Sequence, residues 1–91
     1  MNLNDAQQLH QQYPETFDVP PDIALAYIEP GDLVKLCFTD TERMWVLVES
    51  VTPTVLEGRL SNTPFFLDSL RPGDLVTFER RHVYDIFGPS A

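Results

Sequence analysis

The chain has 91 residues, of which 43% are hydrophobic, and its 14 acidic and six basic side chains give a formal net charge of −8. A chain of this length holds one compact core, which excludes large multidomain enzyme folds. The hydrophobic fraction is typical of a folded domain. Because the negative charge repels phosphate backbones and anionic lipid surfaces, we expect neither a nucleic-acid partner nor a membrane partner.

The N-terminal residues show no targeting signal. Residues 1–5 contain no base and are followed by glutamines rather than by an apolar run, and the longest wholly apolar run, residues 44–48, is too short to cross a bilayer. Cys37 is the only cysteine, whereas small secreted domains usually need several disulfides. We therefore expect a cytoplasmic protein.

The first 30 residues predict an acidic helical arm, because residues 1–32 hold six acids and neither lysine nor arginine. Asn4 is expected to cap a short helix that runs to Gln12. A second short helix is expected after Pro20-Pro21. Its predicted apolar stripe comprises Ile23, Ala24, Tyr27 and Ile28.

From Leu33 onward apolar and polar residues alternate, which is the period of a half-buried strand. Five antiparallel strands are expected, near residues 33–39, 44–49, 56–61, 75–79 and 83–87, with a 3₁₀ turn at 80–82. We predict a mainly β fold in which residues 31–91 form a small SH3-like barrel and residues 1–30 pack on it. The predicted core comprises Val34, Leu36, Phe38, Met44, Val46, Val48, Leu56, Leu60, Val76 and Phe78.

One five-residue string occurs twice. Residues 30–34 and residues 72–76 both read P-G-D-L-V, and the two copies lie 42 residues apart. The proline sets φ, the glycine supplies a positive φ, and the aspartate can accept a hydrogen bond from the turn backbone. Each copy therefore predicts a turn that leads into a strand.

Four strings in order resemble a family of small bacterial domains of unknown function: G-D-L-V-K-L-C-F at 31–38, R-M-W-V-L-V at 43–48, G-R-L-S-N-T-P-F at 58–65 and G-D-L-V-T-F at 73–78. The sequence H-V-Y-D at 82–85 fits the closing element of that family. The resemblance implies a compact, non-enzymatic β-barrel and brings no assigned activity.

No residue set predicts catalysis. Cys37 lies in mid-strand with no adjacent base, so a nucleophilic pair with His10 or His82 is not favoured. The two histidines lack the spacing of a metal-binding motif, and the scattered acids are not accompanied by a glycine-rich phosphate loop. We predict a protein that is not an enzyme and has no cofactor or metal.

Two segments of the sequence are candidate protein-binding sites. Arg43 and Trp45 share one strand face, and both residue types are enriched at interface hot spots. The same face carries Leu47 and is too apolar to remain exposed to water. We therefore expect another segment to pack on it, and the N-terminal arm is favoured over a partner protein. The bases Lys35, Arg43 and Arg59 are then expected to pair with arm carboxylates.

The second place is the loop at 62–71, which holds three adjacent large apolar residues, Phe65, Phe66 and Leu67. This loop is either a contact site for a partner or a plug that closes one end of the barrel. Both interpretations remain open at this point.

Together these features predict a non-catalytic protein-binding module, a monomer or weak homodimer, whose acidic surface favours a basic partner protein. The alternative is an immunity or inhibitor protein that blocks a basic nucleic-acid enzyme or toxin. A small hydrolase is a third class, which the residues do not favour.

Overall fold

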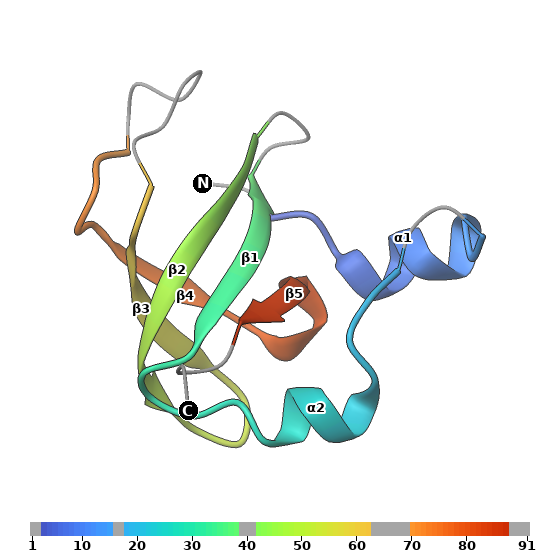
Figure 1. Cartoon of the computed structure of the whole chain (residues 1–91), viewed down its shortest axis with the longest axis horizontal. Helices are drawn as coiled ribbons and strands as arrows, with labels where there is room; N and C mark the ends of the chain where they lie inside the picture. Colours follow the sequence, from blue (N-terminus) through green and yellow to red (C-terminus); the bar gives the residue numbers. More distant parts are fainter. Residues whose placement is uncertain (1–2, 16–17, 39–41, 63–69, 88–91) are drawn as a thin grey trace.

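The computed structural model describes residues 3–15, 18–38, 42–62 and 70–87 (Figure 1). Two short helices come first, and five strands follow. The elements are α1 (Ala6–Gln12), α2 (Asp22–Ala26), β1 (Leu33–Phe38), β2 (Glu42–Val51), β3 (Leu56–Leu60), β4 (Leu75–Phe78), the 3₁₀ helix η1 (Arg80–His82) and β5 (Val83–Phe87). No helix in these ranges is long and apolar enough to cross a membrane.

The five strands form one antiparallel sheet with the order β4-β3-β2-β1-β5. The mainly β fold is therefore confirmed. The sheet curves so that β1 and β2 cross in front of β4 in Figure 1. It does not close into a barrel, because within the described ranges β4 and β5 each pair on one side only and form the two edges.

Alternate residues of the strands fill the core, as the period of two predicts. Each of the ten predicted core residues exposes 2% or less of its surface, so the assignment of inner and outer strand positions is confirmed. Val83 at the start of β5 is also fully buried. We call this side of the sheet the inner face and the other side the outer face.

The arm contributes to the same core. Leu25 and Ile28 expose 6% and 4% of their surfaces and pack within the cluster of inner-face residues. The predicted stripe of the second helix is wrong in part, because Ile23 and Tyr27 are 68% and 76% exposed. The buried pair consists of Leu25 in the helix and Ile28, which follows two residues after the helix ends at Ala26.

The first helix begins one residue later than predicted. Its N-cap is Asp5, whose carboxylate accepts a hydrogen bond from the Gln8 backbone N–H at 3.0 Å. Asn4 instead donates its backbone N–H to the carbonyl of Cys37 at 3.0 Å, next to an isolated bridge between Leu3 and Phe38. The start of the arm is thus held to the end of β1.

The arginines of η1 attach the arm to the sheet. Arg80 donates from Nε to the Leu25 carbonyl at 3.1 Å, and from a terminal nitrogen to the carbonyls of Thr52 and Pro53, each at 3.1 Å. The Arg81 guanidinium lies 3.3 Å from the Asp5 carboxylate. The basic dipeptide therefore connects three segments that are distant in sequence.

Candidate protein-binding face

An apolar row crosses the outer face of the sheet. The register places Phe87 opposite Leu33, Leu33 opposite Leu47, Leu47 opposite Arg59, and Arg59 opposite Leu75. Phe87 is 58% exposed, Leu75 49% and Leu47 39%. Directly paired residues point to the same side of a sheet, so four large apolar side chains and one arginine form a line from edge to edge.

The expectation that the arm covers this face is wrong for the described part of the arm. Leu25 and Ile28 pack on the inner face, whereas Tyr13 and Ile23 are 57% and 68% exposed. Figure 1 shows α1 and α2 beside the sheet rather than across the front of β1 and β2. The curved sheet leaves one side of its core open, and closing that opening uses the buried surface of these short helices.

Two bases lie over aromatic rings next to the apolar row. The Lys35 Nζ is 5.0 Å from the centre of the Trp45 ring and 5.9 Å from that of Tyr84. The Arg43 guanidinium is 4.6 Å from the centre of the Tyr84 ring. Each such contact stabilises the arrangement by about 0.5 to 1 kcal/mol at an exposed site. We call Lys35, Arg43, Trp45 and Tyr84 the cation–aromatic cluster.

The predicted pairing of the outer bases with the arm is also corrected. Arg59 pairs with Glu49 of β2 at 2.9 Å rather than with an arm carboxylate. In the arm, the Asp5 carboxylate forms an ion pair with Arg81 of η1. The physical reason is again the position of the arm, which approaches η1 and the open side of the core.

Trp45 stands beside a hollow of about 390 Å³ on the outer face. Leu33 and Phe87 form its other apolar walls, and Ser61 and Asn62 complete it. The backbone of Trp45 is held on both sides, because its carbonyl accepts from the Ser61 N–H at 2.9 Å and its N–H donates to the Asn62 side-chain oxygen. The hollow can receive one large apolar side chain.

Several residues of this site were not predicted from sequence, namely Tyr84, Ser61, Leu75 and Phe87. Tyr84 lies where the pairing of β5 with β1 shifts, from Asp85 opposite Lys35 to Val83 opposite Leu36. This irregularity directs Tyr84 toward Lys35. The sequence signal is the spacing of the apolar residues Val83 and Ile86, which are three positions apart instead of two. In the structure both pack on the core.

The structure describes some of the site residues predicted from the sequence and not others. Trp45 and Arg43 lie on the outer face, as predicted, with Trp45 half-buried and Arg43 exposed. Phe65, Phe66 and Leu67 lie outside the described residues, so their role as contact site or plug stays a prediction. Over the ranges that the structure describes, no three His, Cys, Asp or Glu side chains are grouped so that they could hold a metal ion.

Comparisons with protein-family models, with curated proteins and with solved structures find no match for this chain. The resemblance carried by the G-D-L-V and R-M-W-V strings therefore stays an expectation.

Proposed function

We propose that this chain is a non-catalytic protein-binding module and that the outer face of its sheet is the contact surface. The observation that supports the proposal most directly is the apolar row, in which Leu47, Leu75 and Phe87 remain between 39% and 58% exposed while the arm packs elsewhere. Large apolar side chains that stay exposed side by side on one sheet face are typical of a protein–protein contact surface.

The composition of the face fits an interface. Trp, Tyr and Arg are the residue types enriched at hot spots, and the cation–aromatic cluster supplies one Trp, one Tyr and one Arg beside the row. The hollow beside Trp45 is suited to a large apolar anchor from the partner. Burial of one such anchor at the centre of an interface contributes on the order of 2 kcal/mol.

Charge supports a basic partner. The formal net charge is −8, and residues 1–32 hold six of the acids without lysine or arginine. Such a field raises the association rate with a positively charged protein, and the effect falls as salt is added. A basic nucleic-acid enzyme or toxin, blocked by this chain as an inhibitor, would satisfy the same requirement.

The SH3-like class is part of this proposal. A meander of β1 to β4, with β5 returning to pair with β1 after a 3₁₀ turn, supports it. The class carries no argument for a particular ligand, because one small fold serves many functions.

Site-directed photo-crosslinking in the native host tests the proposed face. A photoreactive phenylalanine analogue is placed at position 47 or at position 75, and at the exposed turn position 54 as a matched control. One protein should be captured from both outer-face positions and not from position 54. Equal capture at all three positions, or none at 47 and 75, would overturn the proposal.

The captured protein then allows a quantitative measurement. Trp45→Ala should weaken binding of the purified partner by about 10- to 30-fold, mainly through faster dissociation. Since Trp45 is half-buried, thermal unfolding by circular dichroism must show that the variant is folded. Leu47→Ala, at a more exposed position, is the second variant and should weaken binding by a smaller factor, whereas Thr54→Ala should not change it.

A further inference from the structure

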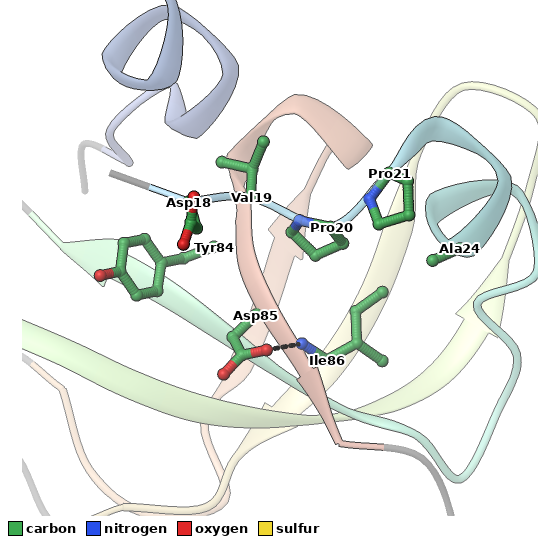
Figure 2. A pocket seen from close by; sticks show the side chains of 8 residues that line it. All are labelled: Asp18, Val19, Pro20, Pro21, Ala24, Tyr84, Asp85 and Ile86. Carbon is green, nitrogen blue, oxygen red and sulfur yellow. Dashed lines mark hydrogen bonds between the residues drawn. The ribbon is translucent and has the colours of Figure 1, made fainter. Parts of the chain in front are cut away.

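A groove of about 600 Å³ lies between residues 18–24 and β5 (Figure 2). Pro20 and Ala24 from the arm and Ile86 from β5 give it an apolar wall. Its other end is polar, and there Asp18 and Tyr84 lie near each other, with Asp85 further along β5 in Figure 2. The groove thus combines an apolar wall with two carboxylates and a phenol ring.

No lysine or arginine lines the groove. Lys35, which is directly opposite Asp85 in the sheet, has its ammonium over the rings of Trp45 and Tyr84. Within the described ranges, the ion pairs of Arg59 and Arg81 are formed with Glu49, Asp5 and Glu79, and not with Asp18 or Asp85. One oxygen of Asp85, Oδ1, accepts the Ile86 backbone N–H at 2.8 Å. This bond holds the carboxylate at the groove and leaves its second oxygen available.

We propose that this groove binds a lysine or arginine side chain of the partner protein, an inference that rests on the proposed protein-binding function. The aliphatic stem lies along Pro20 and Ile86, as long basic side chains do on apolar surface. The cationic head lies between Asp18 and Asp85, beside the ring of Tyr84. The basic partner is thereby recognised at one defined place as well as through the overall charge.

The groove is continuous with the proposed contact surface. Tyr84 belongs both to the groove and to the cation–aromatic cluster, and Asp85 is directly opposite Lys35 in the sheet. The Lys35 ammonium is directed over the rings of Trp45 and Tyr84. A partner seated on the outer face therefore reaches the groove at the β5 edge without crossing the core.

Titration with a small probe tests the groove without the partner. The probe is the capped tripeptide acetyl-Ala-Arg-Ala-amide, and the matched control peptide carries neutral citrulline in place of arginine. Binding is followed by the backbone amide shifts of the full chain in ¹H–¹⁵N NMR spectra. The arginine peptide should give saturable shifts centred on Val19, Ala24, Asp85 and Ile86, and the citrulline peptide should not.

Three variants that each remove one negative charge separate a site from general charge attraction. Asp18→Asn and Asp85→Asn should each raise the dissociation constant about two- to fivefold, the effect of a solvent-exposed ion pair. Asp85→Asn keeps an oxygen that can accept the Ile86 N–H. Glu29→Gln, at an exposed arm position outside the groove, should leave the constant unchanged.

The outcomes distinguish this inference from the function on which it rests. Non-saturable shifts spread over all acidic residues would contradict the proposed binding site in the groove. Equal effects of Asp18→Asn and Glu29→Gln on the dissociation constant would contradict it as well. In both cases crosslinks from positions 47 and 75 would still support the contact face. Saturable, Asp18-dependent peptide binding supports the groove even where crosslinking fails. In that case only the proposed contact face is rejected.

Discussion

Asp32 and Asp74 occupy the same position in two turns of identical sequence, and their side chains make the same hydrogen bond. Asp32 Oδ2 accepts from the Glu29 N–H at 3.0 Å, and Asp74 Oδ2 accepts from the Arg71 N–H at 2.9 Å. The glycine before each aspartate has a positive φ, 100° in the first turn and 88° in the second. A repeat of five residues thus produces two turns with the same side-chain hydrogen bond and the same glycine conformation.

The two turns also attach to the sheet in the same way. In the first, the Gly31 N–H donates to the Val48 carbonyl and the Val48 N–H donates to the Asp32 carbonyl, both at 2.9 Å. In the second, Gly73 and Asp74 form the equivalent pair with Leu60, at 2.7 and 3.0 Å. The same kind of turn is therefore hydrogen-bonded to β2 ahead of β1 and to β3 ahead of β4.

The two aspartates should nevertheless differ in their contribution to stability. Asp32 is only 6% exposed, whereas the Asp74 bond is exposed. A buried donor left without a partner costs more than one that water can reach, so Asp32→Ala should lower the free energy of unfolding by about 1 to 3 kcal/mol and Asp74→Ala by about 0.5 to 1.5 kcal/mol. Urea unfolding measures both. The asparagine variants, which keep the acceptor, are the controls, and a larger loss at Asp74 would contradict this assignment.

Gly58 is required by close packing of β3 on β2. An added Cβ would meet the Leu47 backbone and the Val46 side chain, with 2.6 Å to the Val46 Cγ1. Gly58→Ala should therefore destabilise the protein by about 1 to 3 kcal/mol through overpacking. Glu57→Ala, one residue earlier on the outer side, should change stability by less than about 0.5 kcal/mol. Equal melting temperatures of the two variants would show that β2 can move to make room.

Arg80 should hold the arm on the core, because its guanidinium donates to three carbonyls in two segments. A lysine lacks the planar fork that reaches them together. Arg80→Lys should weaken arm docking by about 1 to 2 kcal/mol, seen as faster hydrogen exchange at the amides of Leu25 and Ile28. Strand amides should be much less affected. Arg71→Lys is the control, and unchanged exchange in Arg80→Lys would mean that apolar packing alone holds the arm.

His82 should make the fold sensitive to mild acid. Burial lowers the pKa of His82 below its ordinary value of 6.5, and the neighbouring Arg81 charge lowers it further. Its Nδ1 accepts the Glu79 N–H at 3.0 Å, which requires the unprotonated atom. At pH values well above 6.5 the ring is neutral in both the folded and the unfolded chain. As the pH falls, the unfolded chain takes up the proton first, so the free energy of unfolding decreases.

The variant His82→Asn isolates this effect. The asparagine oxygen can accept the same N–H but does not titrate, so the loss of unfolding free energy between about pH 7.5 and about pH 5.5 should be smaller than in the parent protein. Chemical unfolding at several pH values measures the difference. Identical pH profiles for parent and variant would show that His82 has no part in the acid sensitivity.

The amino-acid sequence was sufficient to predict the strands and the orientation of their residues. Val46 and Phe78 are buried as the period of two requires, and the twin P-G-D turns form where glycine and aspartate favour them. These features follow from interactions between residues close in the chain. The same local rules failed at the bulge between Lys35 and Leu36, which depends on how β5 meets β1 and places Tyr84 in the candidate site.

The position of the arm was decided only by the tertiary structure. The sequence shows that the arm is acidic and has apolar residues, but both the inner opening and the outer face offered apolar surface for it. Leu25 and Ile28 close the inner opening, with Arg80 bonded to the Leu25 carbonyl. That choice depends on the curvature of the whole sheet and on contacts more than 50 residues apart, which no local pattern contains. It leaves Leu47, Leu75 and Phe87 exposed on the outer face.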